Sequence, residues 1–319
     1  MNGVIVRWGL LPIMAVLLQG AACAQAAADG ALLEMREAFR RNNAQALTAL
    51  LPQVRGHMLE PLARYWEAKA RLETANPTEL RETMARMAGT YWEDRLRNDW
   101  LLWLGQQRDW ATFAAELPRF RMNDVRQVKC YALMLDAVAK RLPADSAAKQ
   151  VVPLWLAQRD AEDGCSTAAQ ALFESGHLGA DLVWKRARLT MEAGRIRAVT
   201  QAVGLVAADA VPIAQAIATN PGRYLDDKIT AIRPRTKELV TLAIIRLADK
   251  DPDAAAREMD HTRWKAQLTQ EERSWLWGVI GKRAAQKLQD NALTYFANGQ
   301  DRFMHADHLA WKARAGLRA

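Results

Sequence analysis

Signals that start and end α-helices recur along this chain from about residue 29 to its last residues, and they constrain the fold more than any other feature. Asn76-Pro77-Thr78-Glu79 and Asp251-Pro252 each place an N-cap residue before a proline at the first helical position. Thr269-Gln270-Glu271-Glu272 has the pattern of a capping box. Helix ends with a left-handed residue are expected at three glycines, Gly176, Gly194 and Gly299.

Apolar residues between these signals follow helical spacing. Two stripes are predicted to face a core, Val125, Val128, Ala132, Leu135 and Val138 in one and Leu239, Leu242, Ile245 and Ala248 in the other. Alternating β-branched runs joined by tight turns are absent from the sequence. We therefore expect an all-α fold of a dozen or more helices of about 10–18 residues joined by short loops.

A long row of short antiparallel helices predicts an irregular α-solenoid, a superhelix of helix pairs. A regular tetratricopeptide array is disfavoured, although Leu104-Gly105 comes close to its Trp-x-x-Leu-Gly-x-x-Tyr pattern. Trp100 stands one residue too early for that pattern, and Arg108 occupies the tyrosine position.

Residues 1–26 have the features of a secretory signal peptide. Arg7 supplies a positive charge, the uncharged run from Trp8 to Leu18 is short, and Ala24-Gln25-Ala26 is a small-x-small cleavage site. Cleavage after Ala26 would leave residues 27–319 as one periplasmic α-superhelical domain with no membrane segment. The alternative is lipidation of Cys23, although Gly20 stands where a lipobox has leucine.

Two cysteines remain after this cleavage, Cys130 and Cys165. An even pair in an oxidising compartment predicts a disulfide. It would enclose 34 residues and contribute about 4 kcal/mol by chain entropy. The alternatives are two free buried thiols or a metal site, and no cysteine or histidine nearby has zinc spacing.

Loss of Arg7 lowers the formal net charge from +8 to +7. The basic residues are dispersed and interleaved with acids, which favours solvated helix faces, and a mildly positive surface facing an anionic polymer such as cell wall is the functional alternative. Nucleic acid is excluded as a partner because no compact basic-aromatic patch occurs. The basic residues in question are Arg81, Arg86, Arg95, Arg97, Lys185, Arg186, Arg188, Arg195 and Arg197.

Eleven of the 12 tryptophans follow the signal peptide, among them Trp100, Trp103, Trp110, Trp275 and Trp277. Aromatic rings can stack on sugars, but the helical spacing favours a core role with each N–H hydrogen-bonded. The segment His305-Ala306-Asp307-His308, with Asp301 nearby, could hold a metal ion. Because no third ligand is placed by the sequence, a solvated polar helix is preferred, and no metal or cofactor site is predicted.

Arg95 to Trp110 and Trp184 to Gly194 are similar to a helical hairpin and a later helix, respectively, of the soluble lytic murein transglycosylases. His57 to Leu72 and Lys250 to Arg257 resemble two further helices, although Arg64 and Trp66 depart from the pattern. The cysteines Cys130 and Cys165 fall where that family has its superhelix disulfide. The resemblance covers the chain from about residue 30 onward and implies a bacterial muramidase-like superhelical domain.

In that family the superhelix precedes a lysozyme-like domain that cleaves the MurNAc–GlcNAc bond of peptidoglycan and leaves a 1,6-anhydro end. That domain carries Glu-Ser and Gly-Leu-Met-Gln motifs. Here Glu174-Ser175 has no Gly-Leu-Met-Gln after it, and Tyr295 to Gly299 scrambles a second motif of the family. No catalytic residue is therefore assigned, and the catalytic domain is expected to be absent.

The resemblance implies a non-catalytic region that shapes a ring admitting glycan strands. The alternatives are a stand-alone periplasmic, tetratricopeptide-like scaffold that binds protein partners, and an enzyme with an unrecognised site. A solenoid needs a polar cap at its ends, so the apolar residues of the final segment predict fraying or self-association there. These residues are Phe303, Leu309, Trp311 and Leu317.

Overall fold

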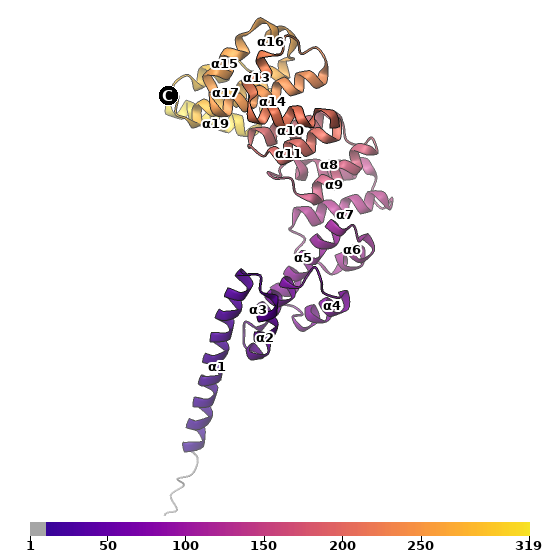
Figure 1. Ribbon diagram of the computed structural model, residues 1–319, viewed down its shortest axis with the longest axis vertical. Coiled ribbons are helices and arrows are strands. Elements are labelled where there is room, and N and C mark those ends of the chain that lie inside the picture. The colour runs from indigo at the N-terminus through magenta and orange to yellow at the C-terminus, as the bar shows by residue number, and fades with distance from the viewer. Residues whose placement is uncertain (1–10) are drawn as a thin grey trace, which may run out of the picture. The chain divides into compact units, whose positions relative to one another are not determined.

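The computed structural model describes residues 11–319, with side chains from Gln25 onward. Within this part the chain forms nineteen α-helices and four short 3-10 helices and contains no strand, which confirms the all-α prediction (Figure 1). The helices group into two compact units, Met1–Ala132 and Leu133–Ala319. No helix among the described residues is long and apolar enough to cross a membrane.

The predicted signal peptide lies largely outside the residues that the structure describes. Its first ten residues, and the side chains up to residue 24 with Cys23 among them, lie outside the described residues. Backbone from Leu11 belongs to the first helix, which continues past Ala26 to Arg40. Cleavage after Ala26 and lipidation of Cys23 stay alternative predictions.

The first unit contains six α-helices and two 3-10 helices, followed by the start of a helix that continues into the second unit. The 3-10 helices are Leu51–Val54 and Leu117–Arg119. The α-helices are α1 (Leu11–Arg40), α2 (Ala44–Leu50), α3 (Glu60–Ala70), α4 (Pro77–Arg86), α5 (Tyr91–Gln107), α6 (Trp110–Glu116) and the shared α7 (Arg126–Val138).

Helix α5 organises this unit with buried charges as well as apolar side chains. The Asp94 carboxylate accepts hydrogen bonds from the backbone N–H groups of Arg121, at 3.0 Å, and Met122, at 2.7 Å. Arg97 donates to Glu116 at the end of α6, with 2.6 Å between Nη1 and Oε2. These contacts fasten α6 and the chain that follows it to α5, because a buried charge without a partner would be strongly destabilising.

The second unit contains twelve further α-helices and two 3-10 helices, Ala208–Ala210 and Asp301–Phe303. Its α-helices are α8 (Ala144–Leu156), α9 (Asp163–Glu174), α10 (Ala180–Glu192), α11 (Ile196–Val206), α12 (Val211–Thr219), α13 (Pro221–Asp226), α14 (Pro234–Lys250), α15 (Pro252–Asp260), α16 (Thr262–Gln267), α17 (Gln270–Gln286), α18 (Ala292–Ala297) and α19 (Ala306–Arg318).

Helices α14 and α17 form the centre of the second unit. The predicted stripe on α14 is confirmed, since Leu239, Leu242, Ile245 and Ala248 are all buried. Helix α17 is buried on most of its circumference and packs against α14, α15, α18 and α19. A helix covered on all sides needs apolar or fully paired residues at nearly every position.

The predicted helix caps are confirmed at the three start signals. Asn76 accepts from the Thr78 N–H at 2.9 Å, and Asp251 accepts from the Ala254 N–H at 2.9 Å. The capping box at Thr269 is complete in both directions. Each cap depends on residues within one turn, which is why the sequence alone revealed it.

Two of the three glycine helix ends were predicted correctly. Gly176 and Gly194 adopt positive φ angles of 79° and 70°. The prediction for Gly299 is wrong, because its φ is not positive. A Cβ there would lie 3.2 Å from both the Cα and the carbonyl oxygen of Ser274, so glycine permits a close backbone approach at this point.

The buried face of α7 is rotated about the helix axis relative to the predicted apolar stripe. Val128 is fully buried, but Val138 is 71% exposed. The buried side carries Tyr131 and Met134 in place of Ala132 and Leu135. Spacing fixes the period of a stripe but not which of two adjacent rows is buried, and the bulkier pair contributes more buried area.

Solvated helix faces were also the wrong interpretation for three arginines, since Arg97, Arg186 and Arg188 are buried. Arg186 donates to the backbone carbonyls of Gln158 and Asp160. Arg188 forms a two-bond pair with Glu238, at 2.7 and 2.8 Å, and a further contact with Glu271 at 2.8 Å. Guanidinium groups suit such buried positions because their five donors can all be directed at acceptors.

The core interpretation holds for six tryptophans, which are buried: Trp100, Trp155, Trp184, Trp264, Trp275 and Trp277. The expected hydrogen bond to each indole N–H is present at Trp264, which donates to Glu258 at 2.6 Å. It is absent at Trp155 and Trp275 among the described residues. There Arg186 and Arg188 lie over the rings at 5.9 and 5.7 Å, so cation–π contacts accompany these two indoles.

The structure contains a disulfide, as the sequence predicted. Cys130 lies in α7 and Cys165 in the first turn of α9, and both residues are disulfide-bonded and fully buried. The pairing of these two cysteines with each other stays a prediction that peptide mapping tests.

Candidate functional site

A groove of about 880 Å³ lies in the second unit. Its walls come from the end of α8, the last turn of α10 with the turn that follows it, α17, and the start of α19. Pro153, Leu156, Leu189 and Trp311 supply its apolar surface. This volume falls in the range of small-molecule and peptide sites in proteins.

Glu192 is the central charged residue of the groove. It is the last residue of α10 and only 6% exposed. Its Oε1 lies 2.5 Å from Lys282 Nζ on α17, and its Oε2 lies 3.0 Å from His308 Nε2 on α19. Lys282 also contacts Asp307 of α19. A single carboxylate thus joins three helices.

The position of Glu192 explains why it needs two partners. A carboxylate at the C-terminal end of a helix meets the negative end of the helix dipole. Burial also opposes its ionisation, but the hydrogen bond from His308 and the charges of His308 and Lys282 outweigh burial and lower the Glu192 pKa to about 2. Glu192 is therefore ionised at neutral pH.

The interpretation of the segment from His305 to His308 as a solvated polar helix is wrong. His308 is fully buried, and it packs edge-on against Trp275. His305 is half-buried, and burial together with repulsion from His308 lowers its pKa. No group of three or more potential metal ligands occurs among the residues whose side chains are described, 25–319. His308 directs Nε2 at Glu192.

The groove has a surplus of positive charge. Five basic and three acidic side chains line it: Arg159, Lys185, Arg195, Lys282 and Arg283, and Glu192, Asp249 and Asp307. Lys282 is held by Glu192 and Asp307, and Arg283 by Asp249 at 3.1 Å. Each of the three acids is thus in contact with one of these two cations, and the lining as a whole keeps an excess of two positive charges.

Three cations at the rim stay available. Arg159 and Lys185 form no ion pair within the described part of the chain. Arg195 contacts Asp160 at 3.3 Å, but both side chains are about half exposed or more, so water screens this pair. An anion entering the groove would meet Arg159 and Lys185 without an ion-pair partner among the described residues, and Arg195 with only a solvent-screened one.

The loop that carries Arg159 is held in place by the Arg186 side chain of α10. Arg186 donates to the carbonyl oxygens on either side of it, those of Gln158 and Asp160. Gln158 is 3% exposed, and its Nε2 donates to Glu162 at 3.0 Å. Because a carboxylate needs a donor, this bond fixes the amide orientation and leaves Gln158 Oε1 without a hydrogen-bond partner among the described residues.

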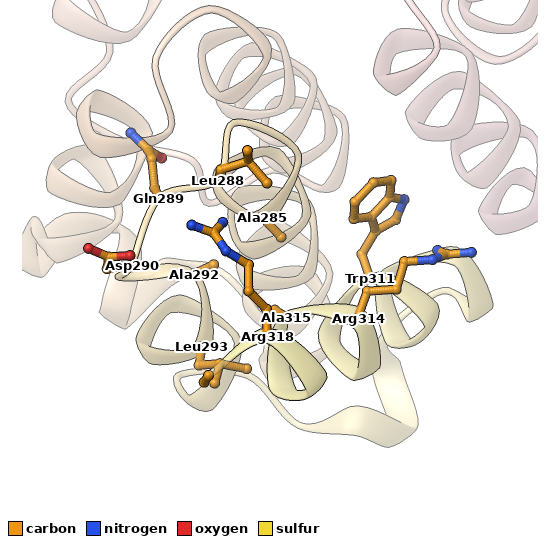
Figure 2. Close-up of a pocket in the computed structure, with 11 residues that line it drawn as sticks. Ala285, Leu288, Gln289, Asp290, Ala292, Leu293, Trp311, Arg314, Ala315 and Arg318 are labelled. Carbon is orange, nitrogen blue, oxygen red and sulfur yellow. The ribbon is translucent and has the colours of Figure 1, made fainter.

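A smaller pocket of about 250 Å³ lies beside the groove, between α17, α18 and α19. Figure 2 shows side chains of these helices converging on it, with Ala285 and Leu288 from α17 and its end, and Ala315 and Arg318 from α19. Trp311 lines both this pocket and the groove, so its indole stands between them.

The first unit has a polar hollow of about 500 Å³ that is lined in part by the hairpin from Arg95 to Trp110. Trp103 lines it and is neither buried nor fully exposed. Asp99 also lines it, and its carboxylate accepts a hydrogen bond from the Tyr65 hydroxyl at 2.9 Å and lies 3.2 Å from Lys69 Nζ. The Asp99 charge is therefore already satisfied within the protein.

Sequence reasoning missed Glu192, Lys282 and Gln158 as site residues. The signal for Lys282 was available: it follows the apolar run from Trp275 to Gly281, where a charge must be paired if the helix is buried. The rejected motif Glu174-Ser175 lies at the exposed end of α9, away from the groove lining.

The architecture and this groove define an all-helical, superhelical protein with a basic cleft. No protein-family model matches the sequence, and no curated protein is a significant match. Solved structures do match. The lytic transglycosylase Slt from Pseudomonas aeruginosa, an inactive mutant, aligns over 90% of this chain with 20% identity and a TM-score of 0.56.

Two further structures give the same result. Slt70 from Escherichia coli, a 70-kDa soluble lytic transglycosylase, aligns over 92% of this chain at 18% identity and a TM-score of 0.52. A complex of the 70-kDa soluble lytic transglycosylase with bulgecin A aligns over 92% of this chain at 17% identity and a TM-score of 0.51. This chain therefore has the superhelical fold of soluble lytic transglycosylases, which confirms the resemblance found in the sequence. It covers 45–47% of the length of those proteins.

Proposed function

We propose that this chain is the superhelical, non-catalytic region of an exported lytic transglycosylase that acts in peptidoglycan turnover. Its role is to form part of a ring that admits glycan strands to a catalytic site. The fold carries this proposal: about nine-tenths of the chain aligns with the soluble lytic transglycosylase structures. Export to the periplasm belongs to the same proposal and is supported by the signal-peptide pattern of residues 1–26.

Two features of the chain support a role at the cell wall. The groove between α8, α10, α17 and α19 presents uncompensated positive charge, and peptidoglycan is a polymer whose peptide stems carry carboxylates. A disulfide suits a protein that works outside the reducing cytoplasm. Both features concern binding and stability, and neither supplies the acid that cleavage of a glycosidic bond needs.

The experiment incubates purified residues 27–319 with cell-wall sacculi, sediments the sacculi, and analyses the supernatant by mass spectrometry. We expect the protein to sediment with the sacculi and no anhydro-muropeptides to be released. A protein that stays in the supernatant at low salt contradicts a cell-wall role and favours the scaffold for protein partners. Release of anhydro-muropeptides that is lost in Glu174→Gln would show that the chain is catalytic.

A further inference from the structure

The groove of the second unit combines three features that together describe a ligand. Lys185 and Arg159 offer unpaired positive charge, Gln158 offers a buried acceptor without a donor, and Trp311 with Leu189 offers an apolar wall. A carboxylate satisfies the first feature, an amide N–H the second, and a short aliphatic side chain the third. All three groups occur in one class of molecule, a short peptide with free carboxylates.

We propose that this groove binds a carboxylate-bearing peptide, and, resting on the proposed function, that the peptide is a stem of peptidoglycan. Lys185 of α10 and Arg159 of the loop after α8 hold the carboxylates. The unpaired Oε1 of Gln158 accepts an amide N–H of the peptide. The glycan strand to which the stem is attached would then be held by its peptide side.

The groove is built to keep these groups in place. Arg186 fastens the backbone on both sides of Arg159, with 2.9 Å between its Nη2 and the Asp160 carbonyl oxygen. Lys185 lies on the same helix as Glu192, which is anchored to α17 and α19 through Lys282 and His308. The rim cations therefore project from rigid elements, and little ordering is lost when an anion binds.

The internal acids do not cancel this attraction. Glu192 and Asp307 are both in contact with Lys282, and Asp249 is in contact with Arg283. A ligand carboxylate thus meets net positive charge, and the partial enclosure of the groove strengthens each charge-assisted hydrogen bond relative to open water.

The test uses a synthetic tripeptide, L-Ala-γ-D-Glu-L-Lys with free carboxylates, and the same peptide with every carboxylate amidated. Binding to residues 27–319 is measured by calorimetry at low and moderate salt. We expect the free peptide to bind. The amidated peptide should bind at least about tenfold more weakly, because its charge-assisted contacts are lost. Equal binding of the two peptides would overturn the proposal.

The variant Arg159→Gln/Lys185→Gln removes both cations. Neither forms an ion pair among the described residues, so the fold should be retained, and circular dichroism checks this. We expect it to bind the free peptide at least about tenfold more weakly than the parent chain. The control is Lys149→Gln, which removes one positive charge where the double variant removes two, at an exposed lysine of α8 outside the groove. An equal loss in both variants would mean attraction to overall charge only, and would contradict a site.

Sacculus sedimentation separates this proposal from the proposed function. If the double variant still sediments with sacculi as well as the parent does, the cell-wall role stands and the groove is not its peptide site. If the tripeptide binds through Lys185 and Arg159 but no chain sediments with sacculi, the groove binds carboxylate peptides and the cell-wall role is wrong.

Discussion

At the scale of single residues, buried charges distinguish this protein from a simple apolar stack of helices. Glu192, Lys282 and His308 come from three helices and satisfy one another in the interior. Removing one partner of a buried ion pair takes away a contact that a buried charge needs, which is destabilising by about 3–5 kcal/mol. The geometry of the groove therefore depends on this cluster remaining complete.

The Glu192 cluster predicts how stability depends on acid. The folded-state pKa of about 2 lies below the ordinary value of 4.5, so the stabilisation is complete above about pH 5 and is lost as the pH falls toward 2. The full effect is on the order of 3 kcal/mol. Urea titrations of the parent chain at several pH values should show this loss.

In Glu192→Gln the acid-dependent loss should be smaller and the protein less stable at pH 7. Glu174→Gln is the matched control, because Glu174 is exposed at the end of α9 and should change stability by less than about 0.5 kcal/mol. An identical slope between pH 5 and 2 in Glu192→Gln and in the parent would contradict the cluster as the source.

A second prediction at this scale concerns a glycine in α17. A Cβ on Gly281 would lie 2.7–2.8 Å from ring atoms of Phe296, which is fully buried. Gly281→Ala should therefore destabilise the protein by about 1–3 kcal/mol through overpacking, although alanine is the better helix former. Urea denaturation measures the difference.

Gly316→Ala provides the comparison for Gly281→Ala. Gly316 lies in α19, and no atom would come within 4 Å of an added Cβ. The substitution should stabilise the protein by about 0.4–1 kcal/mol, because it restricts the unfolded chain at no cost in contacts. If both alanine variants changed stability in the same direction, packing against Phe296 would not be the deciding factor.

At the scale of elements, the first turn of helix α9 contains one disulfide-bonded residue, Cys165, and α7 contains the other, Cys130. We predict that non-reducing peptide mapping of the oxidised protein finds these two cysteines linked to each other. The closed loop of 34 residues makes the double variant Cys130→Ser/Cys165→Ser about 2–5 kcal/mol less stable.

The reduced parent protein is the control for the cysteine variant. It should lose a similar amount of stability, since both lack the cross-link while the reduced parent keeps its native side chains. Quantitative alkylation of both thiols in unreduced native protein would contradict the pairing.

At the scale of the whole molecule, apolar surface gathers around the last helix. Leu317 of α19 is 90% exposed, and Leu288, which lines the small pocket between α17, α18 and α19, is 64% exposed (Figure 2). Exposed apolar residues next to a concave surface are typical of contact sites. We therefore predict self-association through this end, visible as concentration-dependent sedimentation.

The variant Leu288→Gln/Leu317→Gln should sediment as a monomer at concentrations where the parent associates. Val138→Gln is the control, since Val138 is equally exposed but lies on α7. Hydrogen exchange adds a second readout: residues from about 290 onward should exchange faster than residues 125–140. A monomeric parent with equal protection in both segments would favour a self-capped scaffold.

Most of the local structure of this protein was determined by its sequence. The caps at Asn76, Asp251 and Thr269 and the buried stripe of α14 all follow from the sequence alone. The reason is that capping and helical periodicity involve residues within a few positions of one another, so the chain specifies them wherever the helix packs. The similarity to lytic transglycosylases also followed from motifs of this local kind.

Tertiary structure alone decided the groove and its charges. Glu192 and His308 are 116 positions apart, and Arg188 reaches Glu238 and Glu271 across 50 and 83 positions. Read along the chain, each of these residues looks like part of a solvated polar face. Whether a charge is exposed or buried depends on which distant helix brings its partner. The packing of α10, α14, α17 and α19 against one another decides which of these charges are buried, and the spacing of residues within one helix does not predict it.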